Sequence, residues 1–152
     1  MNETIREIVI QDIVARAADI TQENGYATNI GVNVVRARKS LDPSDLPAVV
    51  IFPGVEEAVH QYGGLSCTMS MRIEGVMLFE DENSSVVSEK ILGDLKKCFL
   101  GDDWSRSPDY IDKIVYTRGG TDDYPEEGQV SVGAMIQIDV GYASRLEDPT
   151  QQ

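Results

Sequence analysis

The sequence VSVGAMIQIDVGY at residues 130–142 carries an apolar side chain at every second position, from Val130 to Tyr142. The sequence CTMSMRIEGVMLF at residues 67–79 shows the same alternation, interrupted only by Gly75. Because successive side chains of a β-strand point to opposite faces, both stretches predict long, half-buried strands. At about 3.3 Å per residue each strand extends roughly 40 Å, whereas a compact chain of this length has a diameter of roughly 38 Å. Such strands overhang their own domain, which favours assembly with other chains over a catalytic pocket.

The composition indicates one globular domain, because 152 residues with 41% hydrophobic content can bury a core. We expect this domain to span residues 1–146, followed by a flexible tail at 147–152. The N-terminal stretch carries Glu7, Asp12 and Arg16 in its most apolar part, which is unlike a signal peptide. No run approaches the roughly 20 apolar residues of a membrane helix, so we expect a cytosolic protein with no membrane partner.

The net charge restricts the partners of this chain. It is formally −13, from 26 acidic and 13 basic residues, and the longest cationic clusters are residues 36–39 and 96–97. Proteins that bind phosphates of nucleic acids or anionic membrane surfaces concentrate cations instead. The charge therefore argues against both of these binding classes.

The patterns along the chain predict an α+β fold, a mainly antiparallel sheet of about five strands with two helices on one face. The expected order is α-β-β-β-α-β-β. Asn2 is expected to cap the first helix, Ser84 or Ser85 the second, and Gly75 to mark a bend or bulge. The expected segments are a helix at 2–22, strands at 26–38 and 46–54, a loop at 55–64, a strand at 67–79, a helix from 84 to Gly101, a strand at 110–117, a loop at 118–128 and a strand at 130–142.

The sequence offers little chemistry. His60 is the only histidine, and it is expected to be exposed in a loop beside Glu56, Glu57 and Tyr62, so we expect no catalytic device built on it. No His/Cys cluster has the spacing of a metal site, and the acidic pairs do not match a calcium-binding loop. Cys67 and Cys98 are expected to be buried, reduced thiols. We therefore expect no enzyme, no cofactor and no metal.

Two segments and one aromatic residue are candidates for a partner interface. The 118–128 loop is long for a hairpin, and long loops in compact domains tend to be functional or disordered. Trp104, on a polar connection, either anchors a partner or folds back over the end of the second helix. The interface residues expected from the sequence are Arg118, Asp122, Asp123, Tyr124, Glu126 and Glu127 in the loop, Glu56, Glu57, His60 and Tyr62 in the 56–62 segment, and Trp104.

Three stretches resemble the tail-terminator family of tailed bacteriophages, also described as tail-completion or minor tail proteins. They are ITQENGYATNIG at 20–31, LPAVVIF at 46–52 and MRIEG at 71–75, and the resemblance covers roughly residues 3–80. It implies an α+β subunit that forms a hexameric ring on the head-proximal end of the tail tube, stops tube polymerisation and joins the tail to a neck or head-completion protein. It implies a virion protein assembled in the bacterial cytoplasm, without catalysis or cofactor, and no residue-level site.

The charge is compatible with such a ring. Six copies at −13 each carry −78 formal charges, and an acidic lumen lets DNA pass without specific binding. Repulsion between copies opposes ring closure, so assembly is expected to depend on ionic strength.

Two other functions stay open from the sequence alone. Another head-tail connector or neck adaptor would share the ring geometry in a different layer of the virion. A small-ligand-binding or enzymatic α+β domain would instead need a pocket near His60 and the Gly63-Gly64 turn.

Overall fold

The structure is a computed structural model that describes residues 3–101 and 110–152. Within these residues, two α-helices and five strands follow the order α-β-β-β-α-β-β, which confirms the predicted α+β class. Their bounds are α1 Ile5–Ala17, β1 Val34–Arg36, β2 Ala48–Gln61, β3 Gly64–Leu78, α2 Ser84–Leu100, β4 Ile111–Gly120 and β5 Ser131–Ser144. Short 3-10 helices lie at Gln22–Asn24, Ile30–Val32 and Pro43–Asp45.

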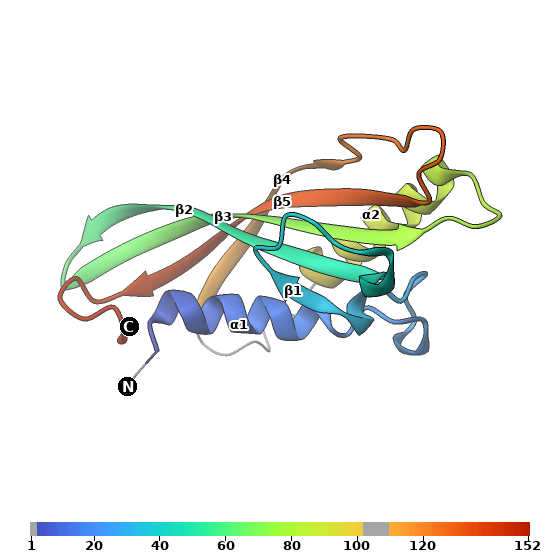
Figure 1. The fold of residues 1–152 in the computed structure, drawn as a ribbon. Helices are drawn as coiled ribbons and strands as arrows, with labels where there is room; N and C mark the ends of the chain where they lie inside the picture. Colours follow the sequence, from blue (N-terminus) through green and yellow to red (C-terminus); the bar gives the residue numbers. More distant parts are fainter. Residues whose placement is uncertain (1–2, 102–109) are drawn as a thin grey trace.

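The five strands form one sheet in the order β1-β2-β3-β5-β4 (Figure 1). β1 is parallel to β2, and every other neighbouring pair is antiparallel. The two strands predicted from the alternation, β3 and β5, lie at the centre and pair from Leu65↔Ser144 to Leu78↔Ser131. Their long antiparallel ladder is therefore the spine of the fold.

One face of this spine is buried under both helices. Cys67, Met69, Met71 and Ile73 on β3 are at most 2% exposed, while the residues between them are only partly buried. The core joins these side chains to those of α1 and α2 in a single cluster, as the alternation predicted. The opposite face of the sheet, which we call the open face, is covered by neither α1 nor α2.

The predicted strand 46–54 continues much further than expected, as β2 runs from Ala48 to Gln61. The prediction of a loop at 55–64 is therefore wrong. Ala48 to Ile51 are buried, whereas every residue from Val55 to Gln61 is exposed. The second half pairs with β3 alone, so it needs no apolar alternation, and its polar composition gave no strand signal.

The predicted strand 26–38 is reduced to β1, Val34–Arg36. The preceding backbone bonds a side chain instead of a neighbouring strand, because Asp94 on α2 accepts from the N–H groups of Ala27 and Thr28 at 3.0 and 2.8 Å. A 3-10 turn then leads into the sheet. Tertiary hydrogen bonds to Asp94 therefore override the strand that the local pattern of apolar residues predicts.

Both helix starts differ from the predicted caps. Thr4 caps α1 by accepting from the N–H of Glu7 at 3.0 Å, and Asn2 lies outside the described residues. Asn83 caps α2 by accepting from the N–H of Ser85 at 2.9 Å, one residue before the predicted Ser84. Gly101 ends α2 as expected, whereas α1 ends at Ala17, earlier than predicted.

Gly75 does not mark a bulge, since it pairs in register with Val49 on one side and Ala134 on the other. A Cβ on Gly75 would lie 2.5 Å from Ile91 Cγ2 and 2.8 Å from Ile30 Cδ1. The glycine is therefore needed for the close approach of the α2 side chains to the sheet. The register shift lies instead in β2, between Pro53 and Glu56.

The C-terminal segment 147–152 returns to the start of the chain. The N–H of Ile5 donates to the carbonyl of Pro149, and the N–H of Arg145 donates to that of Gln151, each at 2.8 Å. The flexible tail expected from the sequence stays a prediction.

Candidate assembly surfaces

The predicted partner loop 118–128 is partly strand. β4 continues through Arg118↔Gln137 to Gly120↔Met135, so Arg118 lies on the sheet and the loop begins at Thr121. The prediction of Arg118 in a loop is wrong because its ladder with β5 continues. The remaining candidate residues of this loop, all exposed, are Asp122, Asp123, Tyr124, Glu126 and Glu127.

An ion-pair network holds this loop to the open face. Arg72, at the middle of β3, donates from Nη2 to Asp122 Oδ2 at 2.7 Å and lies 3.4 Å from Glu74 Oε2. Arg118 Nη2 lies 3.6 Å from the other oxygen of Asp122. Partial burial disfavours the charge on Arg72, but its hydrogen bond to Asp122 and attraction from Glu74 outweigh burial and raise its pKa. The pattern of residues did not predict that Arg72 and Asp122 meet, because they are fifty residues apart in the chain.

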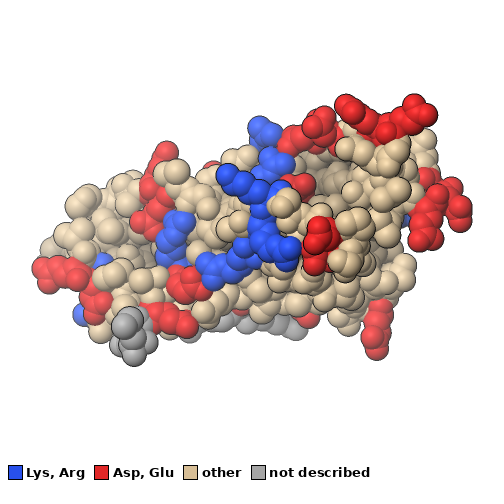
Figure 2. All heavy atoms as spheres, in the orientation of Figure 1, with Lys and Arg blue, Asp and Glu red and all other residues tan. Residues whose placement is uncertain are grey.

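The open face is hollowed on both sides of Glu74. One hollow of about 300 Å³ lies beside Arg72 and Asp122, and neighbouring hollows extend toward Tyr124 and toward Phe52. In Figure 2 the Lys and Arg side chains gather in a band across the middle of the molecule, with acidic side chains mainly toward its two ends. The side of the molecule seen in this view thus has a cationic middle between more acidic ends.

The second candidate segment, 56–62, forms part of a hairpin arm, which we define as residues 55–66. Glu56, Glu57 and His60 lie on β2, and Tyr62 lies in the turn before β3, so their expected loop setting is wrong for the first three. All four are exposed, Tyr62 completely so. Figure 1 shows this arm and the 121–130 loop at opposite ends of the sheet, so the structure does not bring the two candidate segments together.

Glu56 connects the arm to the core. It accepts a hydrogen bond from the hydroxyl of Tyr142, and Arg6 Nη1 on α1 lies 3.9 Å away. Burial and the hydrogen bond to Glu56 raise the pKa of Tyr142. The role of Glu56 is therefore structural, whereas Glu57 makes no ion pair with any residue that the structure describes.

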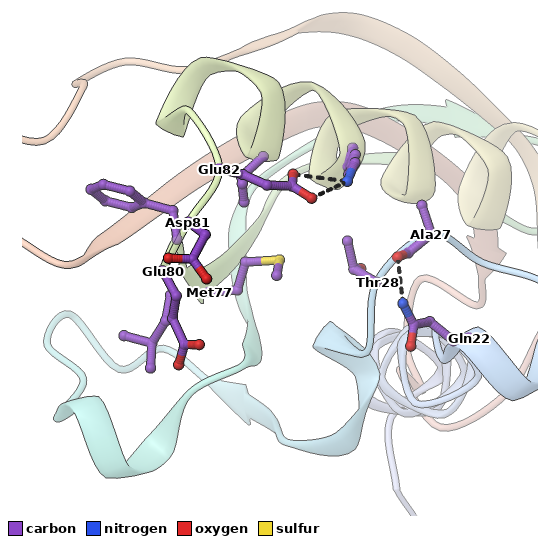
Figure 3. A pocket seen from close by; sticks show the side chains of 11 residues that line it. Gln22, Ala27, Thr28, Met77, Glu80, Asp81 and Glu82 are labelled. Carbon is purple, nitrogen blue, oxygen red and sulfur yellow. Dashed lines mark hydrogen bonds and ion pairs between the residues drawn. The ribbon is translucent and has the colours of Figure 1, made fainter.

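The sequence did not predict the pocket that lies where β3 ends and α2 begins (Figure 3). Its volume is about 420 Å³. Apolar and acidic side chains share its walls, and Lys90 is paired with Glu82 at 2.8 and 2.9 Å. The lining includes Gln22, Thr28, Met77, Phe79, Glu80, Asp81, Glu82 and Val87.

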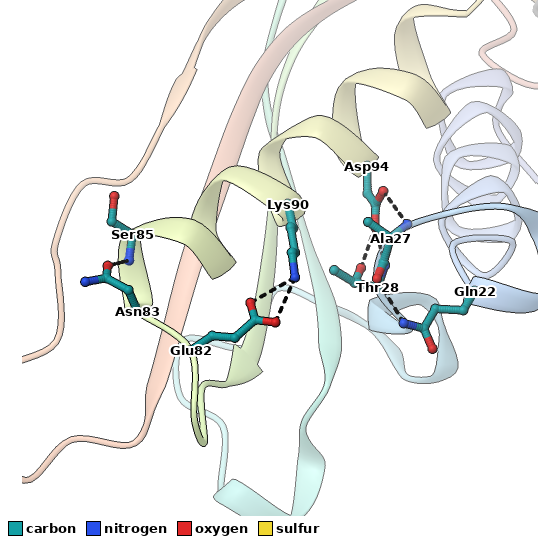
Figure 4. Close-up of polar contacts among 8 residues, drawn as sticks. All are labelled: Gln22, Ala27, Thr28, Glu82, Asn83, Ser85, Lys90 and Asp94. Carbon is teal, nitrogen blue, oxygen red and sulfur yellow. Dashed lines mark hydrogen bonds and ion pairs between the residues drawn. The ribbon is translucent and has the colours of Figure 1, made fainter.

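Next to this pocket, Asp94 fixes the 27–28 segment to α2 (Figure 4). Its side chain is 4% exposed and also accepts from the hydroxyl of Thr28 at 2.6 Å. Three hydrogen bonds on one buried carboxylate compensate its desolvation. Asp94 is thus part of the framework and not of a reactive site.

The described residues provide no metal centre and no reactive thiol. Among residues 3–101 and 110–152, no group of three or more His, Cys, Asp or Glu side chains is placed to hold a metal ion. Cys67 and Cys98 are buried and free, as predicted, and burial raises the pKa of Cys98 to about 12.

Neither helix of the described chain is long and apolar enough to cross a membrane. Trp104, the remaining interface candidate, lies outside the described residues.

A comparison of the chain with protein-family models finds no match, and a comparison with curated proteins finds none either. The resemblance to tail terminators therefore stays a prediction, and the function has to be argued from the assembly surfaces.

Proposed function

We propose that this protein is a structural subunit of a homo-oligomeric ring, and that the ring is the hexameric terminator of a phage tail tube. In this role it caps the head-proximal end of the tube, stops its polymerisation and joins it to a neck or head-completion protein in the virion. The exposed surfaces of the chain support the ring, and the resemblance of residues 3–80 to tail terminators supports the role in a phage tail.

The observation that supports a ring is the hairpin arm. It extends the sheet, and Val55, Val59 and Tyr62 on it are 75%, 67% and 109% exposed. Exposed apolar side chains gathered on one protruding element are typical of protein interfaces. A neighbouring copy that covers this arm would bury this apolar surface.

The two ends of the molecule suit contacts with different neighbours. The arm lies at one end of the long sheet and the acidic 121–130 loop at the other (Figure 1). A terminator needs such an arrangement, because its ring contacts the tube on one side and the neck on the other. The formal charge of −13 is compatible with DNA that passes without specific binding.

The first test measures the mass of the purified chain by light scattering and its effect on tube length. We expect about 100 kDa, six times 16.7 kDa, and tail tubes that stop growing when the protein is added. A double variant Val55→Asp/Val59→Asp should not assemble, whereas Val86→Asp, on the half-exposed surface of α2, should. A chain that stays monomeric at high concentration and ignores tubes would refute the proposal.

The second test separates the terminator from a neck adaptor. Deletion of 122–127 should lower the unfolding midpoint only slightly and abolish docking to the tail or neck, since it removes exposed loop residues, half-buried Pro125 and the partly exposed ion pair of Asp122 with Arg72. Normal tail assembly by this variant would exclude the loop as a contact. A ring that forms but leaves tube length unchanged would favour the adaptor.

A further inference from the structure

We propose that neighbouring copies join edge to edge, with β4 of one copy pairing antiparallel to the outer half of β2 in the next copy. The inference rests on the proposed ring, and it assigns the contact between copies to specific residues. The partner in this contact is a second copy of the same chain.

Two strand edges of similar length are open. β1 covers β2 only at Val49 to Ile51, so beyond Ile51 the strand pairs with β3 alone, at Phe52 and Pro53 and again from Glu56 to Gln61 after the register shift. At the other edge of the sheet, the ten residues of β4 pair with β5 alone among the described residues. Unpaired backbone N–H and C=O groups on an edge accept a further strand.

The strand directions fix the sense of this pairing. β2 runs antiparallel to β3, β3 to β5 and β5 to β4. β4 therefore runs opposite to β2, and a sheet continued from one copy into the next places them antiparallel. Because the contact joins two different edges, each copy can bind one neighbour through β4 and another through β2. The same contact repeated from copy to copy closes into a ring when the rotation between copies allows it.

The side chains on the open face match in one register. Val59 pairs with Ser66 on the face opposite the buried core, and Val115 pairs with Asp139 on the same face. Both valines are exposed, by 67% and 45%. Placing Val59 beside Val115 of the neighbour buries apolar surface of both copies.

The same register brings opposite charges together. The register shift after Tyr116 pairs Arg118 with Gln137 and so places Arg118 on the open face, at the next position beyond Val115. Glu57, opposite Thr68, lies on the same face two residues before Val59. Because the two strands run in opposite directions, the position before Val59 on β2 faces the position after Val115 on β4. Arg118 of one copy then lies across from Glu57 of the next copy. The Glu57 carboxylate can pair with the guanidinium of Arg118, whose side chain is 62% exposed.

The inner end of the β2 edge restricts wrong pairings. Pro53 lacks an N–H, the register shifts between Pro53 and Glu56, and Arg6 donates to the carbonyl of Gly54. Prolines, bulges and charges on an edge discourage indiscriminate pairing. The neighbour's strand is thus directed to residues 56–61.

Cysteine cross-linking tests the register directly. In the double variant Val59→Cys/Val115→Cys, oxidation should link copies into a ladder of oligomers on a non-reducing gel, since paired antiparallel strands place Cβ atoms within disulfide reach. The control Val86→Cys/Val115→Cys carries two equally accessible thiols, one of them on α2, and should give no ladder. Cys67 and Cys98 are buried in both variants.

A charge exchange tests the specificity of the contact. Arg118→Glu and Glu57→Arg should each weaken self-association about tenfold or more, and the two together should restore it. The unfolding midpoint of each variant should stay close to that of the parent chain, because Glu57 is exposed and the ion pair that Arg118 makes with Asp122 joins largely solvated side chains.

The outcomes separate this inference from the proposed function. A ring that forms without the 59–115 link, or with unchanged association in the charge variants, overturns edge pairing and leaves the terminator role standing. Cross-linked rings that do not stop tubes support edge pairing and overturn the terminator role. A chain that stays monomeric overturns both.

Discussion

The two halves of β2 differ although they belong to one strand and pair with the same neighbour. Ala48 to Ile51 are buried, and Val49 to Ile51 lie between β1 and β3, whereas Val55 to Gln61 are exposed and those from Glu56 onward pair with β3 alone. The register shift after Pro53 separates them. Burial of apolar surface in the first half stabilises the monomer, while the second half leaves its apolar surface to a partner.

One strand can therefore contribute to the hydrophobic core with one half and to an assembly surface with the other half. Substitutions in the covered part should lower the free energy of unfolding, and substitutions in the arm should change assembly instead. Four sets of substitutions, with progressively smaller expected changes in the free energy of unfolding, test this separation.

The largest effect is expected at Asp94, a buried residue of α2 that lies outside the arm. Asp94→Ala leaves the N–H groups of Ala27 and Thr28 and the hydroxyl of Thr28 without their acceptor, which should lower the free energy of unfolding by about 3 kcal/mol. Asp94→Asn keeps one acceptor oxygen and should cost less. Urea unfolding measures both, and equal, small losses would show that the carboxylate does not hold this segment.

A matched pair in β2 tests the comparison itself. Val49, which is 0% exposed, should lose about 2 kcal/mol of unfolding free energy on replacement by alanine, through lost burial and a cavity. Val59, at 67% exposed, should lose less than about 0.5 kcal/mol on the same replacement but weaken self-association. Similar losses of unfolding free energy at both positions would contradict the division of the strand.

The junction between the two halves should respond less strongly. Tyr142→Phe removes the hydroxyl that donates to Glu56 and should lower the free energy of unfolding by about 1 kcal/mol. Tyr124→Phe, in the exposed loop, removes a hydroxyl from a half-exposed ring and should have no measurable effect. If both variants match the parent chain, Glu56 does not fix the arm.

The smallest effect concerns the ion pair between α1 and β1. Arg36 donates to both oxygens of Glu7 at 2.7 and 3.0 Å and thereby lowers the pKa of Glu7 below its usual 4.5. A lowered folded-state pKa means that the contribution of Glu7 is present above about pH 4.5 and is lost as the pH falls through the folded-state pKa. Because the pair is near the surface, Glu7→Gln should cost less than about 1 kcal/mol at pH 7.

The measurement is the free energy of unfolding of both chains at pH 7 and near pH 3. The difference between them should shrink toward the lower pH, because protonation of Glu7 removes the charge on which its pairing with Arg36 depends. Glu89→Gln, on the exposed surface of α2, serves as the control. A difference that persists at low pH would assign the effect to packing and not to charge.

The candidate surfaces were predictable in part. Asp122 and Tyr124 lie in an exposed loop and His60 is exposed, as expected, although His60 lies on β2 and Arg118 on β4 instead of in loops. The ion pair of Arg72 with Asp122 was not predictable, because it depends on how a loop folds back over the third strand. The pocket at residues 80–82 was missed because a turn and a helix start form a hollow only when a distant segment packs against them.

The central ladder of β3 and β5 follows from the amino-acid pattern alone, since a period of two in apolar residues has only one buried arrangement on a sheet. The same is true of α2, whose apolar spacing is helical, and of the burial of both cysteines. The lengths of β1 and β2, in contrast, depend on contacts between distant segments. Asp94 draws residues 27–28 away from the sheet, and β3 supplies a ladder to residues 56–61 that their own side chains do not encode. Backbone hydrogen bonds, which are independent of side-chain polarity, made the difference.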